Sequence, residues 1–172
     1  MDPDCYKHIY KMRSQGQSDT RFVHDELGYN YRMTNPAAAL LKGQLEHIDD
    51  IKNKKRKVFD LYRSLLSDVE GVHFQKAEKD TVHSGWMFGV RVDGASFTDM
   101  QSYFSKNFID VRPMFYPVSA HKHLKHLKVH GGEEIAKKIN KECVILPSYP
   151  TLQDHEIAHV VNTLKDYIGL IK

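Results

Sequence analysis

The sequence predicts an α+β fold in which helices and short strands alternate within one compact lobe. The first observation behind this is a long helical period over residues 34–67, and the second is a series of short strand-forming runs separated by helical segments. The third is composition, because 41% hydrophobic and 27% charged residues over 172 positions is typical of a single globular domain.

The N-terminal part of the chain is predicted to form two helices separated by a polar loop. Apolar residues recur at helical spacing within residues 4–13, and the polar run 14–19 ends that helix. Asn35 can cap a second helix with Pro36 in its first turn. Apolar residues then recur every three or four positions, which predicts one amphipathic helix to about residue 67. At ~1.5 Å per residue it would be about 50 Å long and would bridge two lobes.

The middle of the chain is predicted to contain three strands and one helix. The strands are expected at residues 72–74, 86–92 and 109–111. Ser96 followed by Asp99 resembles a capping box, which predicts a helix whose buried face carries Phe97, Met100 and Phe104.

The C-terminal part is predicted to form a helix, a buried strand and a final helix. Residues 133–141 have a helical pattern, and the apolar run 143–146 is typical of a buried strand. Thr151 with Asp154 is expected to start the last helix, whose apolar period continues to Tyr167.

Composition excludes several classes of protein. No run of about 18 apolar residues exists, and the acidic N-terminus differs from a signal peptide, so a cytoplasmic protein without a membrane partner is expected. Cys5 and Cys143 lie far apart and outside any Cys-x-x-Cys pair, so both are expected to be reduced thiols. The net charge of +3 is too small to imply nucleic acid. The basic run 52–57 could be a phosphate-binding patch or a localisation signal, but the apolar period around it favours a solvated helix face.

Four histidines cluster in the Pro- and His-rich loop before the helix at 133–141. They are His121, His123, His126 and His130. Imidazoles at this spacing could share a zinc ion, yet no carboxylate or thiolate completes a recognised ligand spacing. A polar loop and helix surface is favoured, and no metal is predicted.

Four sequence blocks resemble one known family. They are Met-Arg-Ser-Gln-Gly at 12–16, Gly-Tyr-Asn-Tyr-Arg-Met-Thr-Asn at 28–35, Asp-Val-Arg-Pro-Met-Phe-Tyr-Pro at 110–117 and Leu-Pro-Ser-Tyr-Pro-Thr-Leu at 146–152. In this order they resemble the DegT/DnrJ/EryC1/StrS sugar aminotransferases, which depend on pyridoxal phosphate (PLP). The third block is most similar to the perosamine synthase branch, whose members aminate C4 of a nucleotide-linked 4-keto-6-deoxy sugar.

The resemblance implies an aspartate-aminotransferase-like fold of type I, in which a small C-terminal lobe packs over a large cofactor lobe in an obligate dimer. Residues 1–33 would be a remnant of the large lobe and its loop. Residues 34–172 would be the bridging helix and the small lobe, a mainly antiparallel sheet covered by helices. The catalytic lysine of the family lies in a Ser-x-x-Lys stretch followed by Gly-Glu-Gly-Gly, and this sequence has no such stretch. No catalytic residue is therefore assigned, and the chain alone is expected to be inactive.

The motif match assigns a cofactor-binding role to Asn30 and Arg32. In the family the asparagine reaches the cofactor phosphate of the neighbouring subunit, and the arginine helps to bind anionic groups. An amide and a guanidinium just before a helix N-terminus also form a favourable anion site on physical grounds. Both side chains are therefore expected to point outward. The alternative is that Asn30 stabilises the turn after Gly28 and that Arg32 pairs with a surface carboxylate.

The same match assigns Tyr31, Arg112, Phe115, Tyr116 and His121 to substrate binding. Aromatic faces and an arginine suit a base and a diphosphate. The alternative is a packed strand end with Phe115 and Tyr116 in the core. Many relatives carry histidine where Ser119 stands, so which histidine approaches the cofactor is open.

Two functions follow from these observations. The first is the C-terminal part of a nucleotide-sugar aminotransferase, with glutamate as the family's usual amino donor, acting as a homodimer or with the missing N-terminal lobe. The second is an inactive stand-alone lobe that serves as a dimerisation or binding module. If the chain is a lobe built to pack against a larger one, apolar surface should be exposed along one side of the long helix and around residues 6–10.

Overall fold

The computed structural model describes residues 2–172. Contacts divide the chain into two units, Met1–Ile48 and Asp49–Lys172, called here the N-terminal unit and the C-terminal unit. The predicted boundary between residues 33 and 34 concerns lobes of longer proteins rather than contacts within this chain, and it stays a prediction.

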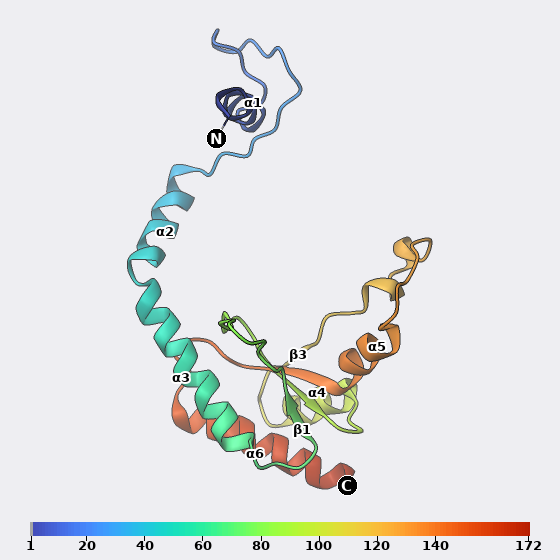
Figure 1. Ribbon diagram of the computed structural model, residues 1–172. Helices are drawn as coiled ribbons and strands as arrows, with labels where there is room; N and C mark the ends of the chain where they lie inside the picture. The colour runs from blue at the N-terminus through green and yellow to red at the C-terminus, as the bar shows by residue number, and fades with distance from the viewer. Residues whose placement is uncertain (1) are drawn as a thin grey trace. The chain divides into compact units, whose positions relative to one another are not determined.

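The N-terminal unit contains two helices, α1 (Pro3–Arg13) and α2 (Asn35–Glu46) (Figure 1). The Asp2 carboxylate accepts a hydrogen bond from the Asp4 N–H at 3.0 Å and so caps α1. Thr34, not the predicted Asn35, caps α2 by accepting a hydrogen bond from the Ala37 N–H at 3.4 Å. Pro36 lies in the first turn, where its missing N–H is tolerated.

A continuous helix to residue 67 was predicted, but the structure interrupts it at His47. Helix α2 ends at Glu46, and α3 (Ile48–Leu66) begins two residues later. Between them, the His47 N–H bonds to the carbonyl oxygen of Gln44 at 3.2 Å, which is a tighter turn than the α-helical one. Asp49 and Asp50 follow in the first turn of α3, where carboxylates favour a new helix start. The apolar period runs through this break and therefore does not reveal it.

The C-terminal unit is built on one antiparallel sheet. Its strands are β1 (Val72–Phe74), β2 (Phe88–Val92), β3 (Arg112–Pro113) and β4 (Cys143–Leu146), in the spatial order β1-β2-β4-β3. The register pairs Val72 with Val92, Phe88 with Leu146, and Arg112 with Ile145. The predicted strands at 72–74 and 143–146 are confirmed at both ends, and the one predicted at 86–92 begins two residues late.

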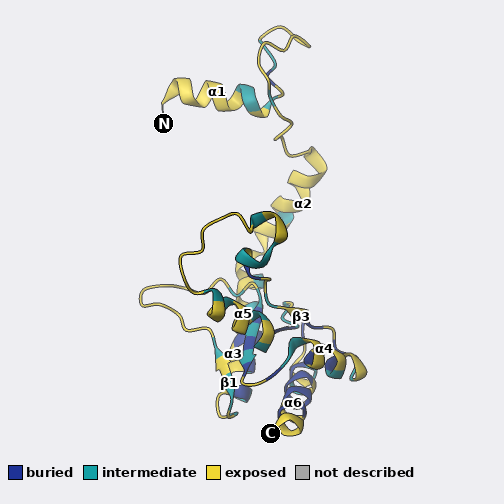
Figure 2. Ribbon diagram, turned by 90° about the vertical axis from the view of Figure 1, so that its right-hand side faces the viewer, coloured by how far each residue is buried: buried dark blue, intermediate teal, exposed yellow. Residues whose placement is uncertain are grey.

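Helices α3, α4 (Phe97–Lys106) and α6 (Asp154–Ile171) supply most of the rest of the core, and Ala95, Ile109, Val111 and Leu152 add to it from connecting segments. Figure 2 shows their buried residues as dark segments. The most deeply buried large side chains are Tyr62, Phe104, Leu66, Met100, Leu146, Ile157 and Leu164. Met100 and Phe104 therefore lie in the core as predicted, with Phe97 packed at its edge. Two 3₁₀ turns, η1 (Val118–Ala120) and η2 (Lys122–Leu124), precede α5 (Glu133–Glu142).

The strand predicted at 109–111 is wrong, although Ile109 and Val111 are buried. Helix α4 ends in a Schellman turn, in which the Ile109 N–H bonds to the Phe104 carbonyl at 3.0 Å and Phe108 has φ of 60°. Strand β3 can therefore begin to pair with β4 only after this turn, at Arg112.

Two predicted helix caps are also wrong. Ser96 precedes α4 but makes no side-chain bond to it. Gln153, not Thr151, precedes α6, and its N–H donates to the Glu156 carboxylate at 2.8 Å.

A search of residues 2–172 for a helix both long and apolar enough to cross a bilayer found none.

Candidate functional site

Two of the sequence blocks pair with each other in the N-terminal unit. Gln15 donates from its N–H to the Tyr29 carbonyl at 3.0 Å, and Tyr29 donates to the Met12 carbonyl at 2.8 Å. Gly16 and Gly28 make this approach possible, since a Cβ on Gly16 would lie 1.9 Å from the Glu26 carbonyl oxygen. The glycines therefore hold residues 29–32 against the end of α1.

Asn30 and Arg32 are both exposed, as predicted. Asn30 forms a β-bridge with Ser14, and Arg32 lines a hollow of about 590 Å³ together with Tyr10 and Ser18. Two nearby carboxylates pair with Lys11 instead, since its ammonium lies 2.7 Å from Asp25 and 3.1 Å from Glu26. The alternative in which Arg32 is held by a surface carboxylate therefore has no support here.

The Lys11 ion pair has the expected effect on its partner. Its hydrogen bond to Asp25 holds the pKa of that carboxyl below its usual value. Ser14 lines the same hollow as Arg32, and its buried hydroxyl has no hydrogen-bond partner among the described residues. Asp19 and Asp25 line this hollow as well, so its lining carries both signs of charge.

In the C-terminal unit, β3 and the segment after it form a second site. Arg112, Phe115 and Tyr116 line one groove of about 730 Å³. Phe115 is 66% exposed and Tyr116 is also exposed, so the alternative that both pack in the core is wrong. His121 lies next to this groove, with its ring edge-on to Tyr116 and the centroids 5.1 Å apart. Tyr31 belongs to the N-terminal unit and is exposed there, stacked on Tyr29 at 5.2 Å.

The Arg112–Tyr116 segment is anchored from two sides. The Asn140 amide on α5 donates to the carbonyls of Met114 at 2.7 Å and Phe115 at 3.3 Å. Met114 also lies over Gly89 of β2, where an added Cβ would come within 2.9 Å of its Cε. Neither contact follows from the local sequence pattern, because both join residues far apart in the chain.

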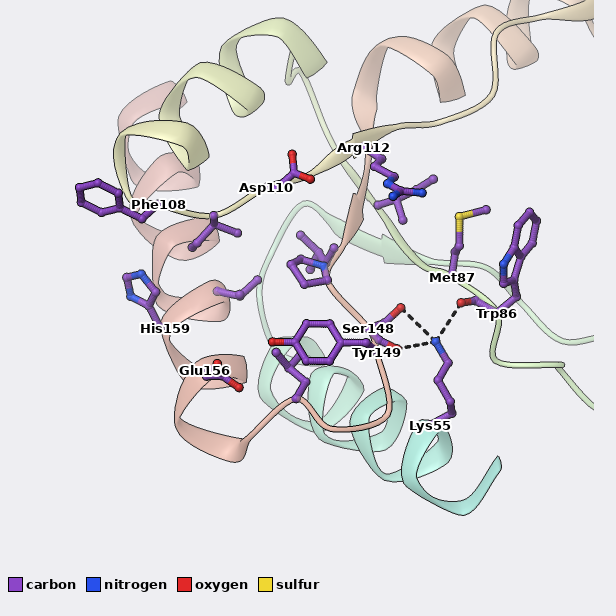
Figure 3. A pocket seen from close by; sticks show the side chains of 16 residues that line it. Lys55, Trp86, Met87, Phe108, Asp110, Arg112, Ser148, Tyr149, Glu156 and His159 are labelled. Carbon is purple, nitrogen blue, oxygen red and sulfur yellow. Dashed lines mark hydrogen bonds between the residues drawn. The ribbon is translucent and has the colours of Figure 1, made fainter. Parts of the chain in front are cut away.

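A neighbouring groove of about 620 Å³, also lined by Arg112, contains a lysine that sequence analysis missed (Figure 3). The Lys55 ammonium donates to the Trp86 carbonyl at 2.9 Å and to both the carbonyl and the hydroxyl of Ser148. Burial lowers its pKa. The sequence did contain a signal of this inward position. Ile51, Lys55, Val58 and Tyr62 are spaced four, three and four residues apart, which places Lys55 on the apolar side of the helix.

The rest of the basic run follows the solvated-face interpretation. Lys52, Lys54 and Lys57 form ion pairs with aspartates at 3.1, 2.7 and 3.0 Å. The prediction was therefore wrong only for Lys55, which faces inward.

Two of the four loop histidines lie close together. The rings of His121 and His123 are 5.6 Å apart. Among residues 2–172, no three His, Cys, Asp or Glu side chains gather closely enough to hold a metal ion.

Comparison with known proteins identifies the family. The model of the DegT/DnrJ/EryC1/StrS aminotransferase family matches residues 1–165. The chain belongs to this family. It is 30% identical over 168 residues to GDP-perosamine synthase of Escherichia coli O157:H7, covering 96% of this chain and 45% of that protein. It is also 30% identical over 165 residues to GDP-perosamine synthase of Vibrio cholerae, covering 94% and 45%.

Solved structures of family members share the fold. A sugar aminotransferase of Streptococcus pneumoniae in its PLP form superposes with a TM-score of 0.86 at 20% identity, covering 100% of this chain and 46% of that one. The Helicobacter pylori aminotransferase PseC superposes with a TM-score of 0.84 at 15% identity, covering 98% and 47%. These likenesses confirm the predicted fold of a sugar-aminotransferase lobe. The chain spans about 45% of the length of the curated relatives that it matches.

Proposed function

We propose that this chain is the C-terminal part of a PLP-dependent aminotransferase that acts on a nucleotide-linked 4-keto-6-deoxy sugar, with glutamate as the amino donor. The observation that carries the proposal is the groove formed by Arg112, Phe115 and Tyr116 in a chain whose family match covers residues 1–165. An arginine and exposed aromatic rings are the groups that bind a diphosphate and a base.

Each assigned residue has a role that its chemistry allows. The Asn30 amide and the Arg32 guanidinium, exposed just before α2, would donate hydrogen bonds to the cofactor phosphate of a partner subunit. Arg112 would bind the substrate diphosphate through its planar fork. Tyr31, Phe115, Tyr116 and His121 would line the substrate site. When bound, PLP supplies the electron sink that amino transfer requires.

The cofactor-binding lysine is not part of the proposed contribution of this chain. The working enzyme would be a dimer in the cytoplasm in which another segment supplies that lysine. The chain alone should therefore bind ligands without turnover, and borohydride reduction with PLP should label several lysines rather than one.

A two-chain reconstitution tests this proposal. The chain would be co-expressed with the part of the Escherichia coli O157:H7 enzyme that it does not cover, and amino transfer from glutamate to a GDP-linked 4-keto-6-deoxy sugar would be measured. Activity is expected only with both parts. Arg32→Gln should reduce activity about 10- to 100-fold, since a charge-assisted hydrogen bond contributes about 1.5–3 kcal/mol.

Arg21→Gln is the matched control, because Arg21 lies exposed in the same loop region with its guanidinium over the Phe22 ring. A complex that binds PLP through one lysine yet makes no amino sugar would contradict the proposal. Turnover by the chain alone, with one lysine labelled stoichiometrically, would contradict the assignment of that lysine to another segment.

A second candidate function is the inactive binding module. Its binding surface would be the exposed apolar residues of α1 and α2, which are Tyr6, Ile9, Tyr10, Leu40, Leu41 and Leu45. In that case the chain should form a stable complex with a full-length family member, seen by size-exclusion chromatography. Substitution of Arg112 in this chain should then leave the activity of the full-length protein unchanged.

A further inference from the structure

The C-terminal unit leaves two large aromatic rings exposed side by side. Trp86, the only tryptophan of the chain, is 68% exposed and stacks with Phe115 at a centroid distance of 6.3 Å and an interplanar angle of 29°. Exposing such rings forgoes the stabilisation that burial would bring. Phe88, Tyr62 and Phe104 in the same unit are buried, whereas Phe108, Tyr116 and Tyr149 are also exposed.

The backbone behind each ring is held by a buried or half-buried polar side chain. Lys55 donates to the carbonyl of Trp86 at 2.9 Å, and Asn140 donates to the carbonyl of Phe115 at 3.3 Å. Burying a lysine ammonium is unfavourable unless hydrogen bonds compensate for lost water, and Ser148 supplies the others. The backbone at both positions is thus held before any ligand binds, which lowers the entropy lost on binding, while the rings themselves keep some freedom to adjust.

The groove around the pair has the charge that a phosphorylated ligand needs. Its lining includes the cationic residues Arg112 and Lys141, and none of the described residues that line it is acidic. Ser96, Thr98 and Asn140 add neutral hydrogen-bonding groups. A planar ring between two aromatic faces needs about 7 Å, twice the ~3.5 Å carbon contact distance, so a small outward movement of one ring would admit a base.

We propose that Trp86 and Phe115 form an aromatic clamp for the base of a nucleoside diphosphate, with Arg112 and Lys141 binding its phosphates. This inference rests on the proposed function and deepens it, because it assigns the base contact to a residue pair that includes Trp86. It further states that the clamp lies wholly within the C-terminal unit. The isolated chain should therefore bind nucleoside diphosphate without PLP and without a partner.

The fluorescence of Trp86 reports directly on this site. GDP titrated into the purified chain should quench the emission in a saturable manner, with N-acetyltryptophanamide used to correct for absorption by the nucleotide. Pyrophosphate, which has no base, should bind more weakly and leave the emission unchanged. Absence of saturable quenching at several millimolar GDP would overturn the clamp, and so would equal dissociation constants for GDP and pyrophosphate.

A pair of matched variants separates stacking from folding. Phe115→Leu keeps most of the side-chain volume but removes the ring face, and it should raise the Kd for GDP about tenfold. Phe108→Leu is the control, because Phe108 is fully exposed and does not line this groove. It should leave the Kd unchanged. Circular dichroism would establish that both variants fold. Equal effects of the two variants on GDP binding would contradict the clamp.

The clamp and the proposed function fail in different ways. A reconstituted enzyme that transfers amino groups while GDP causes no Phe115-dependent quenching would show the clamp to be wrong and leave the function standing. Phe115-dependent GDP binding without formation of any amino sugar would leave the clamp standing and overturn the function.

Discussion

The two units of this chain reach their structures by different means. Every buried hydrophobic residue that the structure describes lies between Val58 and Ile168, in the C-terminal unit. Among residues 2–48 the only buried residue is Gly16, and its burial reflects the close passage of backbone at Gly28. The C-terminal unit is therefore stabilised by its own hydrophobic core, whereas the N-terminal unit is ordered by helix caps and backbone hydrogen bonds.

The N-terminal unit exposes apolar side chains of the kind that the C-terminal unit buries. Fully burying a large apolar side chain contributes about 1.5–3 kcal/mol, and the N-terminal unit leaves Tyr6, Ile9, Tyr10 and Leu45 exposed. The exposure predicted along the helices is confirmed for these residues. We propose that a partner surface covers them, as the family resemblance implies.

The largest expected difference between the units is in the loss of unfolding free energy when one aromatic residue of each is replaced by alanine. Phe104→Ala removes a fully buried ring and should lower the free energy of unfolding by about 3–5 kcal/mol. Tyr10→Ala alters a 48% exposed side chain and should change it by less than about 0.5 kcal/mol. Urea unfolding followed by far-ultraviolet circular dichroism, which reports on the helices of both units, measures both. Equal losses would mean that the N-terminal unit has a core of its own.

The two cysteines offer the next largest contrast. Cys5 is exposed in α1, whereas Cys143 is buried in β4, and burial raises the pKa of the Cys143 thiol to about 11. A thiol-specific reagent at neutral pH should therefore modify Cys143 at least ~100-fold more slowly than Cys5, because both access and thiolate are lacking. Cys5→Ala and Cys143→Ala variants assign the two rates. Similar rates for both thiols would contradict the buried position of β4.

The raised pKa of Cys143 also fixes the sign of a pH effect. Because the folded pKa exceeds the unfolded value of about 8.5, the contribution of the neutral thiol to stability is fully present below pH ~8.5. It is lost as the pH rises through about 11. Cys143→Ala should flatten this alkaline decline in the free energy of unfolding, and Cys5→Ala should not.

The smallest expected effect is on local stability, and it should have opposite signs at two glycines of the N-terminal unit. Gly16 has φ of 68°, and a Cβ there would meet backbone, so Gly16→Ala should cost about 1–3 kcal/mol of local stability. Hydrogen exchange should show lost protection at the amides of Gln15 and Tyr29, with the C-terminal unit unchanged. Gly43→Ala in α2 meets no neighbour and should instead stabilise its helix by about 0.5–1 kcal/mol. The same response at both glycines would exclude the close crossing.

Local sequence patterns predicted the elements whose causes are local. The strands at 72–74 and 143–146 and the helix beginning at Glu133 are confirmed, because apolar runs and periods report directly on burial. The break at His47 and the delayed strand at Arg112 were missed. Both depend on backbone turns that leave the apolar pattern unchanged, and Phe108 adopts a conformation in which glycine would normally be expected.

The candidate site divides in the same way. The residue types at 30–32 and 112–121 were recognised from sequence blocks, and the structure brings Arg112, Phe115, Tyr116 and His121 together. Trp86, Asn140 and Lys55 were not predicted. Their contacts join positions that lie 25 to 93 residues apart in the chain, which no local period encodes.

The sequence by itself determined the fold class, the family and the exposed apolar face of the N-terminal helices, since composition, motif order and side-chain periodicity are properties of the chain alone. Only the tertiary structure decided that Lys55 faces inward, that Phe115 is exposed rather than buried, and that Trp86 stands beside it. The physical reason is that the sheet in the order β1-β2-β4-β3 and the helices packed on it bring positions 25 to 93 residues apart into contact. Which side chains meet depends on this packing and not on their spacing along the chain.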